Sequence, residues 1–328
     1  MLAGLAGAPA SAFEVEDSRT FGVESPEATL RMISTGDIDV FAPIILAYQR
    51  EHPRIAVEYV AVSSTELMRA IEAEGAEFDV ALSSAMDLQI KLANDGMARP
   101  HRSAVTETLP DWAVWRDRVF AFTREPATII LSAEAFADTE RPATRQELIE
   151  LLRADPERFR GRVGTYDIRD SGLGFLFATQ DARSSDTYWR LMEVFGTLDV
   201  RLYCCSGAMI EDVAAGRLLV GYNVLGDYVG AGDAGKVEVV EPSDFTTVMM
   251  RTAIIPGTSP RPARAGTFLD FLLQRSWKGS IGPFGSDAAP GVEAPSHRPI
   301  PLGPGLLVYL DRLKKALFLR EWQSAIEQ

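Results

Sequence analysis

Apolar and polar positions along the first part of the chain follow a repeating order of short strand, polar loop and helix. Residues 30–34, 55–62 and 78–82 are apolar or alternating runs of strand length. Each run ends in small polar residues, and apolar positions at helical spacing follow it. Three such units in succession predict an α/β domain whose sheet is mainly parallel. The loops after its strands should gather at one edge of the sheet, which is where ligands bind.

A second block of the same kind follows a β-rich stretch at residues 119–132. Pro126 interrupts this stretch and removes a hydrogen-bond donor from the strand, which suits a crossing between two domains. An apolar run at residues 246–255 is a candidate for the return crossing. The pattern also predicts strands at 162–168, 218–223 and 237–240, helices at 173–183, 187–195, 209–215, 265–273 and 306–326, and a loop rich in Pro and Gly at 282–304.

Length and charge limit the classes of function. The chain has 328 residues, of which 46% are hydrophobic and 24% are charged, as in ordinary globular proteins. At about 100 to 200 residues per domain, this length favours two domains. The net charge of −13 repels phosphate backbones and anionic headgroups, so we expect neither nucleic-acid binding nor polybasic membrane docking. No run approaches the roughly 18 apolar residues of a membrane-spanning helix.

The amino terminus has the composition of the end of a secretory signal. Residues 2–12 are small and mostly apolar, and they close on Ala10-Ser11-Ala12, so that cleavage would fall before Phe13. The basic segment that opens a signal is missing. The run is therefore either a signal truncated at its start or an ordinary flexible tail of Ala and Gly, and we expect export.

Cysteine and histidine offer little for metal or redox chemistry. Cys204 and Cys205 are adjacent, and a disulfide between neighbours requires strained geometry. We expect this pair neither to staple the fold nor to act as a CxxC motif. His52, His101 and His297 lack the spacing of zinc ligands, so no metal site is expected.

Loops with small hydroxyl residues join the predicted strands to predicted helix starts, and they are the main candidates for a binding site. Such a loop offers backbone N–H groups and hydroxyls at the positive end of a helix dipole, which suits an anion. For a single loop, the simpler interpretation is that its Ser, Thr or Asp caps the local helix. Several loops on one edge favour a shared cleft between two lobes. The candidate residues are Ser34, Thr35, Gly36, Asp37, Ser63, Ser64, Thr65, Ser83, Ser84, Asp170, Ser171, Gly172, Ser206 and Gly207.

Two arginines are further candidates for this cleft. Arg124 lies at the predicted crossing, and Arg169 lies beside the loop at Asp170. A guanidinium at either place would suit bidentate binding of a carboxylate or phosphate. A surface ion pair is the alternative for each of them.

The sequence lacks the motifs of common enzymes. No GxSxG elbow frames a nucleophilic serine, and few histidines are available as a base. Neither a P-loop nor a complete dinucleotide-binding glycine pattern occurs, so nucleotide cofactors are not implied. An isomerase or lyase that used Asp37, Asp167 or Asp170 as its base would lack a paired acid. We therefore expect binding without catalysis and without a cofactor.

Several runs, taken in order, resemble a bacterial ABC-transporter solute-binding protein. They are LRMISTGD, IAVEYVAVSSTELMRAI, FDVALSSAMDLQIKLANDG, RDSGLGFLFATQ, AAGRLLVGYNVLGDY and TTVMMRTAIIPGTSP. The resemblance covers residues 30–282 and is to the branch of extracellular solute-binding family 1 that includes ferric-ion-binding and hexose-phosphate-binding proteins. It implies a type II periplasmic binding fold, in which two α/β lobes joined by two crossing strands close over a solute.

The resemblance also implies a division of the chain. Residues 1–12 would be the remnant of a signal peptide, residues 13–125 and 245–290 one lobe, and residues 126–244 the other. Residues 291–328 would form a C-terminal loop and a helix that packs back on the lobes.

The region after the strand at residues 218–223 bears on the choice of solute. Ferric members of the family hold the metal there with two adjacent tyrosines. Here the region reads GYNVLGDY, without a tyrosine pair or a nearby histidine, so iron is the weaker expectation. Tyr222 and Asn223 remain candidates for the cleft, because polar groups at the end of a buried strand need partners. A Tyr in the core and an Asn in a turn are the equal alternative.

Together these observations predict a periplasmic, monomeric solute-binding component of an ABC uptake system. The solute is expected to be a small polar anion, either a carboxylate or a phosphorylated metabolite, and the partner an inner-membrane permease. One alternative is a sensor protein of the same fold that signals to a membrane histidine kinase. Another is a ferric-ion-binding protein.

Overall fold

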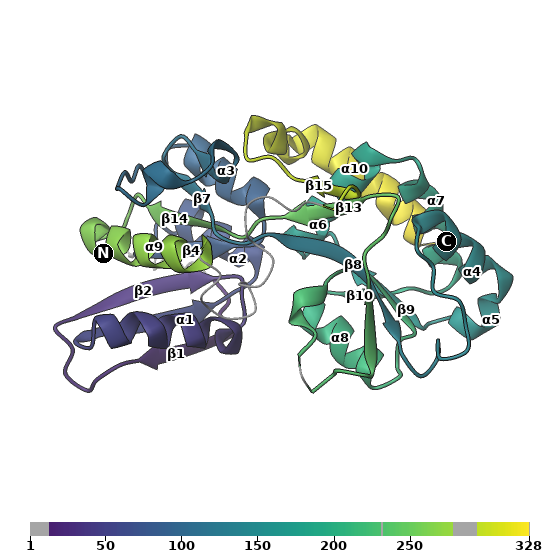
Figure 1. The fold of residues 1–328 in the computed structure, drawn as a ribbon. Coiled ribbons are helices and arrows are strands. Elements are labelled where there is room, and N and C mark those ends of the chain that lie inside the picture. Colours follow the sequence, from purple (N-terminus) through teal and green to yellow (C-terminus); the bar gives the residue numbers. More distant parts are fainter. Residues whose placement is uncertain (1–12, 231, 278–293, 328) are drawn as a thin grey trace, which may run out of the picture.

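Two α/β lobes lie side by side and are joined by extended segments (Figure 1). The computed structural model describes residues 13–230, 232–277 and 294–327. The predicted signal remnant at residues 1–12, most of the predicted loop at 282–304 and the end of the lobe segment at 245–290 lie outside these residues. In the part of the chain that is described, no helix is both long and apolar enough to cross a membrane.

The first lobe is built on a sheet that is parallel at its centre, as the sequence predicts. β2 (Ala28–Ser34) pairs in parallel with β3 (Ile55–Ala61) on one side and with β4 (Val80–Ser83) on the other. β14 (Thr252–Pro256) pairs antiparallel with β4. The sheet is completed by β1 (Asp17–Phe21), β7 (Val119–Ala121) and β6 (Val114–Trp115), and β5 (Ala98–Arg99) pairs with β14.

Helices cover both faces of this sheet, which explains why its central strands are apolar on both sides. α1 (Ile38–Glu51) and α9 (Pro262–Trp277) share one core cluster with the strands. α2 (Ser64–Met68), the π-helical turn η1 (Arg69–Ala73) and α3 (Met86–Asn94) share the other. Short 3₁₀ turns, η2 (Thr106–Thr108) and η3 (Asp111–Ala113), complete the lobe.

The second lobe repeats this plan with its own sheet. β9 (Val163–Tyr166) pairs in parallel with β10 (Arg201–Tyr203) and with β11 (Val220–Leu225), and β8 (Glu125–Ser132) pairs antiparallel with β11. β13 (Thr246–Met249) extends the sheet beyond β8, and β12 (Val237–Val240) also pairs with β8. Its other elements are α4 (Arg145–Ala154), α5 (Pro156–Phe159), α6 (Gly172–Ser184), α7 (Thr187–Thr197), α8 (Ser206–Ala214), η4 (Gly226–Tyr228) and β15 (His297–Pro299).

Both predicted crossings are present as breaks within apolar runs. The run at 119–132 divides into β7 of the first sheet and β8 of the second. The run at 246–255 divides in the opposite direction, into β13 of the second sheet and β14 of the first. The two crossings touch, because Phe122 N–H donates a hydrogen bond to the carbonyl of Arg251 at 3.0 Å. They form the hinge between the lobes.

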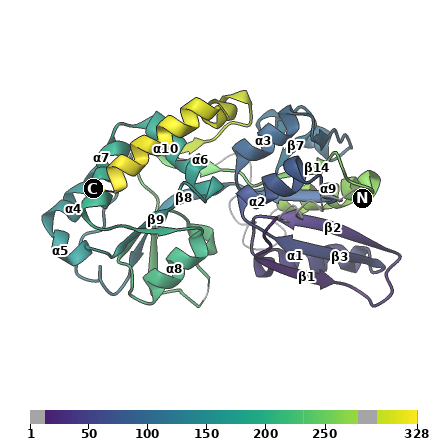
Figure 2. The ribbon, with the colours of Figure 1, turned by 180° about the vertical axis from the view of Figure 1, so that it is seen from behind.

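The C-terminal segment connects the lobes a third time. The helix predicted at 306–326 is instead a 3₁₀ stretch, η6 (Pro304–Leu310), followed by α10 (Arg312–Ile326). The break falls at Asp311, whose carboxylate caps α10 by accepting from Lys314 N–H at 3.1 Å. α10 packs on α7 of the second lobe, whereas η6 packs on α3 of the first (Figure 2).

Candidate functional site

A cleft of about 390 Å³ lies between the lobes beside the hinge. Residues of both lobes line it, and most of them come from loops that join a strand to a helix. From the first lobe these are Glu16, Thr35, Asp37, Val62, Ser63, Ser64 and Ser84, and from the second lobe Asp170, Ser171, Leu173, Cys204, Cys205, Ser206, Gly207 and Leu225. Tyr228 and Arg251 complete it near the hinge.

Four helices of nine residues or more begin at this cleft, and the short helix α2 also starts there. α1 starts after Asp37, α6 after Ser171 and α8 after Cys205, and α3 starts two residues after Ser84. The first turn of a helix carries backbone N–H groups without intrahelical acceptors, and the helix dipole adds partial positive charge there. Each of these four helix ends therefore contributes partial positive charge to the wall of the cleft.

Hydroxyl groups tie the loops of the first lobe together. Ser84 N–H donates to Thr35 Oγ1 at 3.0 Å, and the two hydroxyl oxygens lie 3.2 Å apart. Ser63 caps α2 by accepting from Glu66 N–H at 3.2 Å. These bonds fix the shape of the wall while leaving hydroxyls at the cavity surface.

The lobes touch across the cleft at one of its borders. Gly172 N–H, on the second lobe, donates to Ser64 Oγ, on the first, at 3.2 Å. Only glycine fits here, because a Cβ at this position would lie 2.6 Å from Ser64 Oγ. The structure therefore has its lobes close together.

A buried ion pair at the hinge faces the cleft. Arg251 Nε and Nη2 donate to the two carboxylate oxygens of Glu125 at 3.2 and 3.3 Å, and both side chains are 1% exposed. Arg251 Nη2 also donates to Tyr228 Oη at 2.5 Å, while Thr123 Oγ1 donates to Glu125 at 2.6 Å. Burial lowers the pKa of Arg251, but Glu125 and Tyr228 outweigh this and hold it above its ordinary value. The guanidinium thus stays protonated in its ion pair beside the cleft.

Sequence analysis did not select Arg251 or Tyr228. A signal for Arg251 exists, because it is the one charged residue in the apolar run at 246–255. A charge in such a run needs a specific partner.

Carboxylates also reach the cleft. Asp37 and Asp170, both selected from the sequence, line it together with Glu16, which was not selected. Burial raises the pKa of Glu16, and the charge of Asp37 adds to this effect. The cleft therefore combines positive helix ends with carboxylates that accept hydrogen bonds.

Some of the selected residues lie beneath the cleft surface. Ser34 and Ser83 are buried, and their hydroxyls accept from the N–H groups of Gly36 and Ala85 at 3.1 Å in each case. The Gly36 carbonyl accepts from Tyr59 Oη at 2.7 Å. These side chains shape the loops and do not line the cavity.

Other residues selected from the sequence lie to one side of the cleft. Thr65, Arg169 and Gly172 line a second cavity beyond the Ser64–Gly172 contact. Arg169 forms ion pairs with Asp167 at 2.6 Å and with Glu327 at 2.9 Å, which is the surface alternative that the sequence left open. Arg124 lies over the ring of Trp112, with its guanidinium carbon 5.2 Å from the ring centre.

Tyr222 and Asn223 belong to the core of the second lobe, not to the cleft. Tyr222 Oη donates to Asp181 at 2.8 Å and accepts from Arg145 Nε at 2.7 Å. Asn223 Nδ2 donates to the same carboxylate at 2.8 Å. These polar groups in the middle of β11 find their partners in this buried network, with Thr247 as a further donor to Asp181. The side chain of Tyr222 is accordingly 1% exposed.

Cys204 and Cys205 form a disulfide with each other at the edge of the cleft, just before α8. The bond joins neighbours, so it closes no loop of the fold, as expected. Within the described residues, no group of three or more His, Cys, Asp and Glu side chains is placed to hold a metal ion.

Comparison with known proteins places these features in context. The family model described as bacterial extracellular solute-binding protein matches residues 35–278. The substrate binding protein of the ABC transporter from Agrobacterium tumefaciens is 32% identical, with a TM-score of 0.87 over 94% of this chain and 98% of that one. A search of curated proteins finds no match.

Two more distant structures share the fold. AfuA from Actinobacillus pleuropneumoniae, a periplasmic binding protein with fructose-6-phosphate bound, is 15% identical with a TM-score of 0.71, over 92% of this chain and 99% of that one. Iron-bound HitA from Pseudomonas aeruginosa is 16% identical with a TM-score of 0.68, over 91% of this chain and 99% of that one. The resemblance inferred from the sequence and the expected two-lobed fold are confirmed.

Proposed function

Because the chain belongs to the bacterial extracellular solute-binding protein family, we propose that it captures a small solute between its lobes and delivers it to an inner-membrane ABC permease. The solute is bound without chemical change. The protein would carry out this task in the periplasm as a monomer.

The convergence of four helix starts on the cleft is the observation that carries the proposed solute class. Backbone N–H groups at helix starts bind carboxylates and phosphates, and the hydroxyls of Thr35, Ser63 and Ser84 add neutral donors. Arg251, whose guanidinium is paired with Glu125, lines the same cleft near the hinge. We infer that the anionic group of the solute binds against these helix starts.

The carboxylates of Glu16, Asp37 and Asp170 narrow the solute further. They would repel an ion that carries only negative charge, but they accept hydrogen bonds from hydroxyl groups. A molecule with one anionic group and several hydroxyls, such as a sugar phosphate, meets both requirements. The fructose-6-phosphate bound to AfuA is an example of this chemistry in the same fold.

The ferric alternative has less support. Tyr228, the tyrosine that lines the cleft, already binds Arg251, and the described residues bring no metal-binding group together.

A separate experiment tests the identity of the membrane partner. Co-purification with the membrane components encoded beside this protein would distinguish an ABC permease from a histidine kinase.

Capture requires the lobes to close and the ligand to favour the closed state. The Ser64–Gly172 contact supports this mechanism, because a hydrogen bond between the lobes would break when they separate.

Isothermal titration calorimetry tests the solute class. The titrants are fructose 6-phosphate, fructose, inorganic phosphate, citrate and ferric citrate. Each lost charge-assisted hydrogen bond costs about 1.5 to 3 kcal/mol, so we expect fructose to bind at least about tenfold more weakly than its phosphate. Binding of fructose alone, or of ferric citrate alone, would contradict the proposal.

A further inference from the structure

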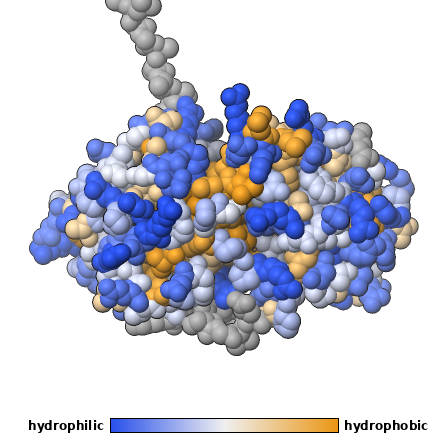
Figure 3. Space-filling model, turned by 90° about the horizontal axis from the view of Figure 1, so that it is seen from above, coloured by the Kyte–Doolittle hydropathy of each residue, from blue (hydrophilic) through white to orange (hydrophobic). Residues whose placement is uncertain are grey.

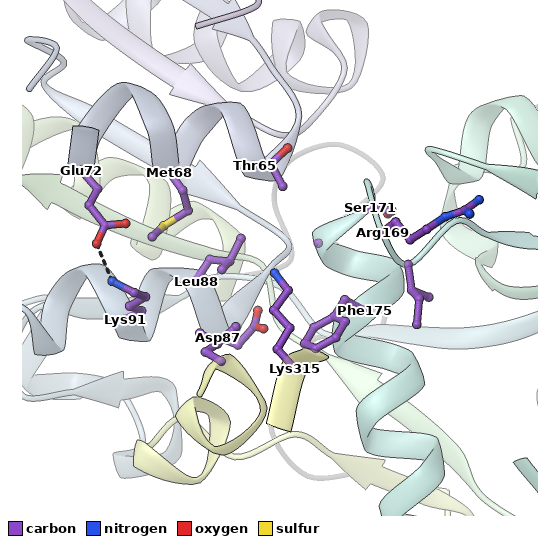
Figure 4. A pocket seen from close by; sticks show the side chains of 13 residues that line it. Thr65, Met68, Glu72, Asp87, Leu88, Lys91, Arg169, Ser171, Phe175 and Lys315 are labelled. Carbon is purple, nitrogen blue, oxygen red and sulfur yellow. Dashed lines mark hydrogen bonds and ion pairs between the residues drawn. The ribbon is translucent and has the colours of Figure 1, made fainter. Parts of the chain in front are cut away.

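A second cavity, of about 230 Å³, lies next to the cleft and is separated from it by the Ser64–Gly172 contact. Its walls come from α2, η1 and α3 of the first lobe and from α6 and the C-terminal segment of the second (Figure 4). Figure 3 shows the molecule from above, and on this face apolar side chains gather near the middle, between hydrophilic regions. The proposed cleft function does not use this cavity.

Asp87, in the first turn of α3, is the buried acid of this cavity. Its side chain faces the cavity and is 3% exposed, and no described residue forms a hydrogen bond to its Oδ1. Burial raises the pKa of this carboxyl to about 7, against the opposing effect of nearby backbone N–H groups and Lys315. A buried acceptor without a donor is unfavourable, so a ligand that supplies one gains binding energy.

Lys315 is a basic residue that lines the same cavity as Asp87. Its side chain reaches from α10 into the cavity, with the ammonium 5.1 Å from the ring centre of Phe175 (Figure 4). The positive charge of Lys315 acts to lower the pKa of Asp87. Among the described residues, however, no ion pair joins the two side chains. An acidic and a basic side chain thus face the same space.

The other charges around the cavity are already neutralised. Glu72 and Lys91 form an ion pair at 2.5 Å, and Arg169 is paired with Asp167 and Glu327 outside the cavity. The remaining wall is largely apolar and includes Met68, Leu88 and Phe175.

We propose that this cavity binds a small zwitterion with an apolar side chain, of the chemical class of the apolar α-amino acids. The ammonium of the ligand donates to Asp87, its carboxylate meets Lys315, and its side chain packs on Phe175, Met68 and Leu88. The cavity is smaller than the roughly 300 to 1,000 Å³ of sites for drug-sized ligands, which limits the ligand to about the size of an amino acid. Because both lobes contribute, the bound zwitterion favours the closed arrangement.

Calorimetry with three matched titrants tests this assignment on the full chain. L-leucine carries both charged groups, 3-methylbutylamine lacks the carboxylate, and 4-methylpentanoate lacks the ammonium. We expect leucine to bind at least about tenfold more tightly than either fragment, a factor that corresponds to about one charged contact.

Two variants identify the groups that make these contacts. Asp87→Asn should weaken leucine and the amine by about tenfold and leave the acid unchanged, whereas Lys315→Met should weaken leucine and the acid and leave the amine unchanged. Lys314→Met, at the neighbouring exposed position of α10, is the matched control and should bind leucine as the parent protein does. Circular dichroism checks that each variant is folded.

Two results would overturn the assignment. One is an absence of leucine binding at millimolar concentration. The other is leucine binding that Asp87→Asn and Lys315→Met leave unchanged, because the ligand would then occupy another site. Either result is independent of the cleft, whose solute is tested with sugar phosphates.

Discussion

Replacement of Asp87 by Asn should stabilise the protein at alkaline pH. The buried carboxyl has a pKa of about 7 in the folded state, compared with an ordinary value of 3.8. A carboxyl with a raised folded-state pKa favours folding below its unfolded pKa, and this contribution is lost as the pH rises through the folded value. Asn does not ionise, so the variant does not lose stability in this way.

The magnitude follows from the two pKa values. Their difference of about 3 pH units corresponds to about 4 kcal/mol at about 1.36 kcal/mol per unit. This penalty is complete above about pH 8. At pH 5 only about 2 kcal/mol of it is present, because the folded-state carboxyl is still protonated. The advantage of Asp87→Asn over the parent should therefore grow by about 2 to 3 kcal/mol between pH 5 and pH 8.

Urea unfolding followed by circular dichroism at the two pH values measures this difference. Asp138→Asn, which removes an exposed carboxylate, is the control and should change the free energy of unfolding by less than about 0.5 kcal/mol at either pH. An equal effect of Asp87→Asn at pH 5 and pH 8 would refute the reasoning, since it would mean that the carboxyl is hydrated in the folded protein.

Three further substitutions test the hinge, the core and lobe closure. Arg251→Met should destabilise the fold by about 3 to 5 kcal/mol because it leaves Glu125 buried without its partner, and adding Glu125→Gln should recover part of this loss in urea unfolding. Tyr222→Phe should lower the free energy of unfolding by about 1 to 3 kcal/mol and leave solute affinity unchanged. A large loss of affinity would indicate instead that Tyr222 contacts the solute. Gly172→Ala should lower solute affinity by about tenfold or more in calorimetry, since its Cβ would lie 2.6 Å from the opposite lobe. Gly305→Ala, at an exposed position of η6 where an added Cβ would meet no atom within 4 Å, should bind normally, and equal effects of the two alanines would argue against closure at Gly172.

Local patterns were sufficient to predict much of the fold. β2, β3 and β4 are apolar because both faces are covered, and each ends in a polar loop before a helix, so periodicity alone locates them. β1 was missed because it is an exposed edge strand with polar residues, which resembles a loop in sequence. α10 was joined to η6 because the capping role of Asp311 does not interrupt the apolar pattern.

The site was harder to predict because its chemistry depends on tertiary pairing. The hydroxyl loops could be selected from the chain, but a sequence does not show that Ser34 and Ser83 turn their hydroxyls toward their own loops. Arg251 acquires its role from Glu125 on the other crossing, and Asp87 faces Lys315 from the opposite end of the chain. Such pairs follow only from the arrangement of the two lobes.

Native mass spectrometry of the freshly purified protein, beside a denatured control, tests the central claim most directly. The account predicts a bound small molecule whose mass fits a hydroxylated anion, such as a sugar phosphate, and which is lost on denaturation. A bound iron ion or neutral sugar would contradict it. So would an unliganded mass together with no thermal shift across sugar phosphates and organic acids.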